Sequence, residues 1–279
     1  MINRRAALLS GLAAAALPSS SWAARQAGDP RVQTVAGPVM GLREDGISVF
    51  KGVRYGAPTR RFQPPEPPAP WTDPVRAVAF GGASPQRGDE PNQSEDCLFL
   101  NIWTPGADAG RRPVMVYIHG GAYSSGSGAH PLYDGSRLAA RGDVVVVTLN
   151  HRLNAFGYAY LARLAEGFED SGNAGQLDLI LALQWVRDNI AAFGGDPDRV
   201  MVFGQSGGGA KIATLMAMPA AKGLFHSAAT MSGQQVTASG PINATNRAEV
   251  WLKALGLTPD RAAEAATLPV ERLIEAQSA

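Results

Sequence analysis

A serine in a glycine-rich turn, Ser206, is the residue of this sequence with the plainest chemical role. The segment GQSGG at 204–208 lies between an apolar, β-branched run at 200–203 and a helix-like stretch at 210–218. Strand, tight turn and helix in this order are typical of a nucleophile elbow, which holds its serine at the apex of a strained turn. The flanking glycines prevent clashes there because they have no Cβ atom. The motif therefore predicts that Ser206 is a nucleophile for acyl transfer.

A second glycine-rich stretch, HGGAY at 119–123, follows the apolar run 114–118. It resembles the HGG(G/A) loop that supplies half of an oxyanion hole. Attack on an ester places negative charge on the carbonyl oxygen, and each N–H group fixed in advance to receive it is worth about a hundred- to a thousandfold in rate. By position, the expected donors are the N–H groups of Gly121, Ala122 and Gly207. The alternative is a glycine-rich turn with no catalytic duty.

The elements that must position these residues are apolar β-like runs that alternate with helix-like stretches. Strands are expected at 31–35, 38–42, 47–55, 95–105, 114–118, 144–149, 200–203 and 223–233, and helices at 135–141, 178–190, 210–218, 241–255 and 261–276. Short turns separate the first three runs, which suits a small antiparallel sheet. The later alternation indicates a single α/β sandwich, with a mostly parallel sheet and helices on both faces.

Several stretches give the chain a resemblance to a known family. They are FGG at 193–195, VMVFGQSGG at 200–208, EDCLFLNIWTP at 95–105, the HGGAY loop, NHRL at 150–153 and AFG at 155–157. Together they resemble the signatures of the type B carboxylesterases, from about Val32 to the last residue. Two positions of the elbow depart from the family pattern, which has Glu before the serine and Ala after it. Here they are Gln205 and Gly207, so a carboxylate beside the nucleophile is missing while the serine is kept.

The resemblance implies an α/β-hydrolase fold, truncated before its last strands. It also implies that Ser206 attacks a small-molecule ester, forms an acyl-enzyme and releases it to water, with no metal and no cofactor. Relatives pair the positions that match Arg61 and Glu95, and Arg152 with Asp178 is expected to form a second ion pair. Both pairs are expected to be structural, since an internal ion pair mainly fixes geometry.

Composition and charge exclude several classes of protein. The chain has 279 residues, of which 45% are hydrophobic and 18% charged, and its formal net charge is +1. Without long charged runs, nothing indicates a nucleic-acid partner, and no apolar run is long enough to span a bilayer. Cys97 is the only cysteine, so an intramolecular disulfide is excluded. No pattern indicates an oligomeric state or identifies the ester.

The first 23 residues are expected to be an export signal. Two arginines at 4–5 precede a mildly apolar, Ala-rich stretch at 6–17 and a small-x-small cleavage site at 21–23. The twin arginines favour the twin-arginine route, and export would place the protein in the periplasm or outside the cell. A Sec signal and an ordinary N-terminal helix are the alternatives.

The partners of the nucleophile are not found in the sequence. The elbow family orders its triad as Ser, then Asp or Glu, then His, and in the type B esterases the last two lie in a C-terminal half that this chain lacks. The four histidines are interpreted as structural or solvated: His119, His130, His151 and His226. We therefore interpret residues 24–279 as the N-terminal portion of a carboxylesterase domain, which should be almost inactive alone.

Two other functions remain open at this stage. One is a non-catalytic fragment, pseudoenzyme or binding module of esterase ancestry, against which the retention of Ser206 and the HGGAY loop argues. The other is a different elbow hydrolase, such as a peptidase or lipase, against which EDCLFLNIWTP argues.

Overall fold

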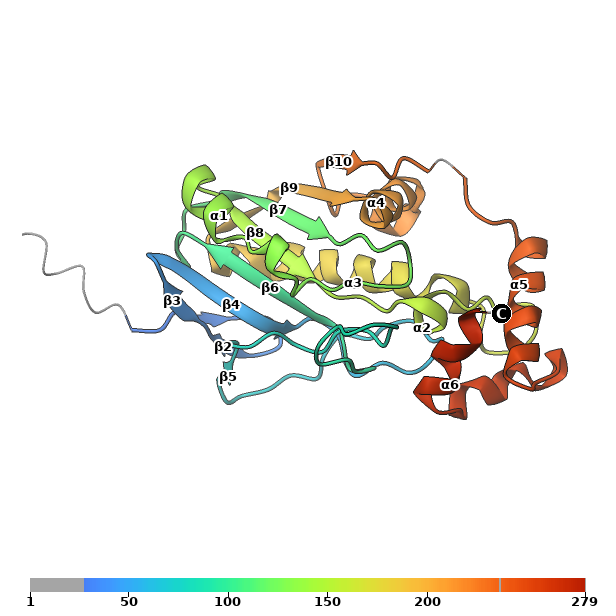
Figure 1. Ribbon diagram of the computed structural model, residues 1–279. Coiled ribbons are helices and arrows are strands. Elements are labelled where there is room, and N and C mark those ends of the chain that lie inside the picture. Colours follow the sequence, from blue (N-terminus) through green and yellow to red (C-terminus); the bar gives the residue numbers. More distant parts are fainter. Residues whose placement is uncertain (1–27, 236, 279) are drawn as a thin grey trace, which may run out of the picture.

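A seven-stranded sheet forms the centre of the molecule in the computed structural model, which describes residues 28–235 and 237–278 (Figure 1). In spatial order its strands are β10 (Ser227–Met231), β9 (Gly195–Gln205), β7 (Arg112–Ile118), β8 (Val145–Leu149), β6 (Phe99–Thr104), β4 (Ile47–Arg54) and β3 (Leu42–Glu44). Strands β10, β9, β7 and β8 are parallel to one another, whereas β6, β4 and β3 are added antiparallel. The predicted α/β sandwich is confirmed, with more antiparallel pairing than expected. The export signal predicted at 1–23 lies outside the described residues.

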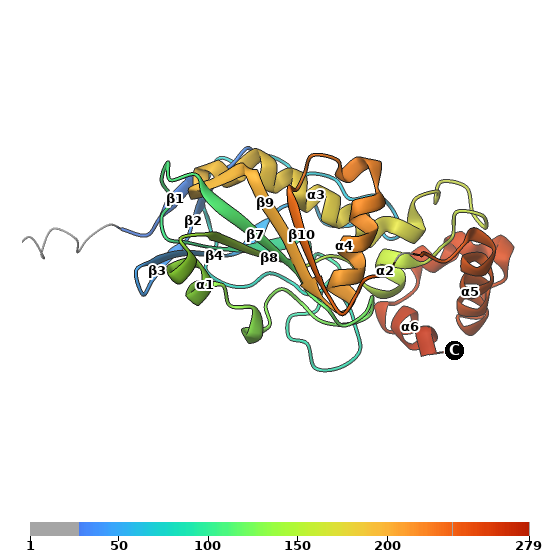
Figure 2. The ribbon, with the colours of Figure 1, turned by 90° about the horizontal axis from the view of Figure 1, so that it is seen from above.

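Helices cover both faces of this sheet, as predicted (Figure 2). Helices α3 (Ala174–Asn189) and α4 (Gly207–Ala217) lie on one face, and α1 (Ser136–Gly142) lies on the other. Every residue of β8 is buried, because a parallel strand covered on both faces has no side open to water. One 3-10 helix, Ile190–Phe193, continues α3, and the others are Pro131–Tyr133, Ser171–Asn173, Pro219–Ala221, Pro259–Thr267 and Ala276–Ser278.

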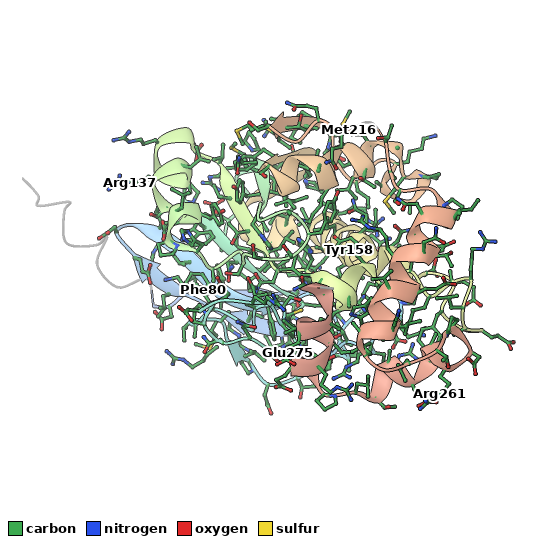
Figure 3. All side chains as sticks on the ribbon, turned by 45° about the vertical axis from the view of Figure 1, so that its right-hand side comes forward. Phe80, Arg137, Tyr158, Met216, Arg261 and Glu275 are labelled. Atoms are coloured by element: carbon green, nitrogen blue, oxygen red, sulfur yellow. The ribbon has the colours of Figure 1, made fainter. Side chains whose placement is uncertain are left out.

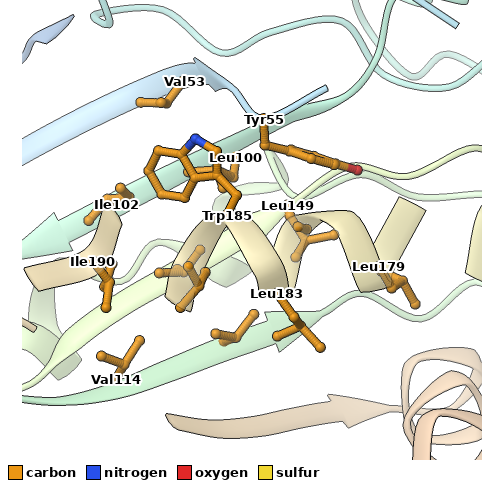
Figure 4. Close-up of a cluster of buried hydrophobic side chains, with 14 of the residues drawn as sticks. Val53, Tyr55, Leu100, Ile102, Val114, Leu149, Leu179, Leu183, Trp185 and Ile190 are labelled. Atoms are coloured by element: carbon orange, nitrogen blue, oxygen red, sulfur yellow. The ribbon is translucent and has the colours of Figure 1, made fainter. Parts of the chain in front are cut away.

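The largest core lies between α3 and the sheet (Figure 4). Leu179 and Leu183 of α3 are almost fully buried there. Leu177, Leu181 and Trp185 are spaced four residues apart in the sequence, which predicts that they share a core-facing side of the helix, but of these only Trp185 is fully buried. Leu181 is half-buried and still packs against this core, so the prediction is confirmed for Trp185 and in part for Leu181.

The small N-terminal sheet contains β1 (Arg31–Gln33), β2 (Pro38–Met40) and β5 (Val75–Arg76). Strands β1 and β2 are antiparallel, whereas β2 and β5 are parallel. The third predicted run, 47–55, belongs instead to the main sheet as β4. In the main sheet β4 pairs with β6, and its residues Val49, Phe50 and Val53 are buried. The free energy gained by this burial decides the pairing, although β4 is closer in sequence to β2.

After β10 the chain leaves the sheet and forms α5 (Pro241–Ala254) and α6 (Val270–Glu275), which lie beside α2 (Asn154–Tyr158) (Figure 1). These helices share a second apolar cluster that includes Phe62, Phe156, Trp251, Leu252 and Leu273. Arg261 lies at the outer edge of this group (Figure 3). Among the described residues, no helix is both long and apolar enough to cross a membrane.

Candidate active site

Ser206 stands between the end of β9 and the first residue of α4. Its backbone has φ 54° and ψ −121°, a conformation that residues with a Cβ rarely adopt. Two hydrogen bonds hold it there: the Ser206 N–H donates to the Met231 carbonyl of β10 at 2.7 Å, and the Ser206 carbonyl accepts from the Ala210 N–H at 3.0 Å. Strain of this kind persists only where the surroundings fix it, and it is common at catalytic nucleophiles.

Glycines let the turn pack directly against neighbouring backbone. A Cβ atom placed on Gly208 would lie 2.0 Å from the carbonyl oxygen of Ile118, the last residue of β7. A Cβ atom on Gly233 would lie 2.0 Å from the carbonyl oxygen of Ser206. No side chain fits at such distances, so these two glycines are required by the close approach of the backbones.

The HGGAY loop leaves the end of β7, the strand next to β9, and reaches the elbow. Gly121 and Ala122 both have positive φ, at 82° and 52°. A Cβ atom on Gly207 would lie 2.2 Å from the carbonyl oxygen of Ala122, so the loop and the residue after the serine are in direct backbone contact. Within residues 28–235 and 237–278, the N–H groups of Gly121 and Ala122 donate to no protein acceptor. The structure therefore brings the four predicted residues together and leaves loop donors free for a ligand.

Lys211 is a feature of the site that the sequence reasoning missed. It lies four residues after Gly207 on α4, is fully buried, and donates from Nζ to the Ala122 carbonyl at 2.6 Å. Its Nζ also lies 5.0 Å from the centre of the Tyr123 ring. Burial lowers the pKa of Lys211 to about 7. A lysine inside an apolar helical stretch, AKIATLMAM, was the available signal.

Two of the histidines, His119 and His151, are buried and stacked, with ring centres 4.9 Å apart and 13° between their planes. The Nδ1–H of each ring donates to a main-chain carbonyl, that of Gly120 at 2.9 Å and that of Arg152 at 3.0 Å. Burial, together with the nearby Lys211 charge, lowers the pKa of His119 to about 3 and that of His151 well below its usual value. Both rings are therefore neutral at physiological pH.

The other two histidines, His130 and His226, also form hydrogen bonds with backbone groups. His130 accepts from the Leu132 N–H at 3.2 Å, and His226 accepts from the Val200 N–H at 3.2 Å. In the part of the chain that the structure describes, which includes all four histidines, no imidazole is hydrogen-bonded to Ser206. None of the four is therefore placed as its base.

The two expected ion pairs are both formed. Arg61 and Glu95 make a two-point contact, with Nη2–Oε1 at 2.6 Å and Nε–Oε2 at 2.7 Å. Arg152 and Asp178 are 1% and 0% exposed, with Nη2–Oδ1 at 2.6 Å and Nε–Oδ2 at 2.9 Å. The Asp178 carboxylate also accepts from the Arg152 main-chain N–H at 2.9 Å. This second pair anchors the segment after β8 to the first turns of α3.

A cavity of about 700 Å³ opens beside the HGGAY loop. Ala122 and Tyr123 line it on the loop side, Tyr158 from α2, and Trp251 and Arg247 from α5. Its lining is mostly apolar and aromatic, which is typical of a site for a small organic molecule. No cluster of His, Cys, Asp and Glu suited to a metal ion occurs among the described residues.

Comparison with known proteins gives a consistent result. Residues 28–275 match the Carboxylesterase family. The chain is 46% identical over 256 residues to the para-nitrobenzyl esterase of Bacillus subtilis (strain 168), covering 88% of this chain and 52% of that protein. A solved PNB esterase is similar with a TM-score of 0.85 at 46% identity, over 90% of this chain and 54% of that one. A carboxylesterase of Geobacillus stearothermophilus gives 0.84 at 43% identity, over 88% and 52%.

The chain thus spans about half the length of the curated relatives it matches. Over that half, the α/β-hydrolase fold predicted from the sequence is confirmed by the sheet order and by the solved structures. With nearly all of the described residues matched, this chain belongs to the carboxylesterase family.

Proposed function

We propose that this chain is the nucleophile-bearing part of a serine carboxylesterase that hydrolyses small-molecule esters through an acyl-enzyme on Ser206. One observation carries the proposal. The strained serine of the elbow and the unoccupied N–H groups of Gly121 and Ala122 meet at the ends of two adjacent parallel strands. A nucleophile and an anion-binding loop at one point are the two parts that ester attack needs.

The proposed reaction has two stages. The Ser206 oxygen attacks the ester carbonyl carbon, a base takes the hydroxyl proton, and the N–H groups of Gly121, Ala122 and Gly207 receive the oxyanion. The carbon–oxygen bond to the alcohol then breaks, and the alcohol leaves with the proton. Water attacks the acyl-enzyme in the same way, releasing the acid and restoring the serine.

The base in this scheme must be a group other than the four histidines described above, because each of them is bonded to backbone and none contacts Ser206. We propose that a histidine and its acidic partner come from a segment outside these 279 residues. The aromatic lining of the cavity suits an ester with an apolar or aromatic group.

A fluorophosphonate probe tests the nucleophile. Trypsin releases residues 200–211 as one peptide in which Ser206 is the only serine. We expect the product of the complete gene to gain the phosphonyl mass on this peptide, and Ser206→Ala to gain none. Ser227→Ala, on the exposed edge of β10, is the matched control and should label like the wild type.

The same experiment decides between the esterase and a non-catalytic binding module, which the lack of a histidine beside Ser206 would favour. If folded gene product stays unlabelled at Ser206, the esterase proposal is overturned. If residues 1–279 alone label as fast as the complete product, the proposed outside base is wrong.

We also propose that residues 1–23 direct export by the twin-arginine route, on the basis of the RR pair and the Ala-rich stretch. Cell fractionation checks this: the protein should be found in the periplasm or medium and lack these residues. Replacing both arginines at 4–5 by lysine should retain the precursor in the cytoplasm. Cytoplasmic wild-type protein with an intact N-terminus would contradict the proposal.

A further inference from the structure

Lys211 is a buried cation without a counter-ion. Its side chain is fully buried, and no carboxylate lies within ion-pair distance of it among the described residues. Within the part of the chain that the structure describes, its Nζ donates one hydrogen bond, to the Ala122 carbonyl at 2.6 Å. An unpaired charge inside a protein is costly, so a buried cation kept beside a candidate active site indicates a functional role.

The hydrogen bond from Lys211 to Ala122 connects the helix after the serine with the HGGAY loop. Lys211 is on α4, the helix that begins with Gly207, whereas Ala122 belongs to the loop after β7. The Ala122 carbonyl oxygen accepts from the ammonium group of Lys211 and also lies against Gly207, where a Cβ atom would be only 2.2 Å from it. The loop therefore contacts both the lysine and the backbone after the serine through one carbonyl, and Ala122 has a positive φ.

We propose that Lys211 is a positioning residue of the oxyanion hole: it fixes the loop through the Ala122 carbonyl, and its positive charge offsets the negative charge that develops on the substrate. The inference rests on the proposed esterase function and adds a charged group to it. Backbone donors carry only partial charges, so a full charge near them strengthens anion binding in a site of low dielectric.

The described neighbours of Lys211 do not change charge near neutral pH, whereas Lys211 does. Burial keeps His119 and His151 neutral by lowering the pKa of each. Burial also raises the pKa of Tyr123 and of Tyr158, whose rings are 4.9 Å apart, so both stay protonated. Beyond His151, the Asp178 charge is matched by its ion pair with Arg152. Among these described neighbours, Lys211 alone has a pKa close to 7.

The sign of the pH effect follows. Below the pKa of Lys211 its ammonium group supplies both a hydrogen bond and a charge, whereas above it the neutral amine keeps only the hydrogen bond. The advantage of the wild type over Lys211→Met should therefore be largest in acid and shrink as pH rises through about 7. Taking the ratio of the two proteins at each pH removes the ionisation of the catalytic base, which both share.

The experiment measures kcat/KM for a 4-nitrophenyl ester from pH 5.5 to 9 with the product of the complete gene. We expect Lys211→Met to lose about a hundredfold below pH 6.5 and about tenfold above pH 8, in line with the loss of one oxyanion contact. Lys211→Gln, which keeps a donor without a charge, should lose less and show a flat ratio. Lys222→Met, on the surface, should match the wild type throughout.

A second readout does not depend on turnover. An arylboronic acid forms a tetrahedral anion on a serine, so its dissociation constant, measured by calorimetry, should rise in Lys211→Met by a factor that shrinks with pH in the same way. If the gene product hydrolyses no ester, the esterase proposal fails while boronate binding still tests the lysine. Folded Lys211→Met and Lys211→Gln with wild-type kinetics and wild-type boronate binding would overturn the inference.

Discussion

If the proposed esterase function is right, replacing Ser206 by alanine in the product of the complete gene is expected to lower the rate of ester hydrolysis by about a millionfold, because a serine hydrolase without its nucleophile keeps only the binding and oxyanion contributions. The structure supports a loss confined to chemistry. The side chain of Ser206 makes no hydrogen bond within residues 28–235 and 237–278, and the turn is held by its backbone bonds to Met231 and Ala210. The folded state should therefore be unaffected. Initial rates with a 4-nitrophenyl ester, together with thermal unfolding of both proteins, measure the two quantities.

The control for this prediction is Ser227→Ala, which changes a serine on the edge strand and should keep the wild-type rate. If Ser206→Ala keeps more than a few per cent of the activity, another residue must be the nucleophile. If the melting temperature of Ser206→Ala falls sharply, its lost rate would reflect unfolding. Ser206→Cys would then be the better test, because its side chain has a similar shape and its thiol can still be acylated by the ester.

Replacing Asp178 by alanine is expected to lower the free energy of unfolding by about 3–5 kcal/mol, the cost of leaving one partner of a buried ion pair without the other. Arg152 is 1% exposed and would keep its charge with the carboxylate gone. Since domains of this kind are stable by about 5–15 kcal/mol, the loss is a large part of the total. Denaturant unfolding followed by circular dichroism gives the value.

An exposed pair of the same chain provides the matched comparison. Arg261 and Glu264 are both 51% exposed, so water screens their attraction and Glu264→Ala should cost far less than Asp178→Ala. Removing both buried charges, in Arg152→Met with Asp178→Leu, should cost less than Asp178→Ala alone, because no unpaired charge remains. Equal costs for the buried and the exposed substitution would refute the argument.

The sequence was most informative where local geometry sets the residue type. The elbow and the HGGAY loop could be predicted because a tight turn and a close backbone approach both require glycine, and the contact of Gly207 with Ala122 is one such approach. The same contact accounts for one departure from the family pattern, since the usual alanine after the serine would meet that oxygen at 2.2 Å. The other departure, Gln205, is exposed and has no such explanation in the structure.

The sequence was least informative where position depends on packing between distant elements. A helical pattern gives the period of α3 but not how deeply each residue is buried, so Leu177 and Leu181 are less buried than predicted, whereas Trp185 lies in the core. The β-like run 47–55 was assigned to the small sheet because it is close to the first two runs in sequence. Its actual partners are chosen by burial in the main core, which the sequence does not show. The apolar helical stretch around Lys211 was the one sequence signal of its burial, and it was not enough, because lysines are usually exposed and the partner of this one lies on a distant loop.

The bond from Ser206 to Met231 ties the candidate nucleophile to β10, which is the edge strand of the described sheet and is largely exposed. Edge strands open locally at a lower free energy than the core of a protein. Each opening of β10 would release the Ser206 N–H and with it one of the two bonds that hold the strained turn. For the described residues alone, the fraction of molecules with a correctly shaped nucleophile should therefore follow the local opening of this strand more closely than the global unfolding of the domain.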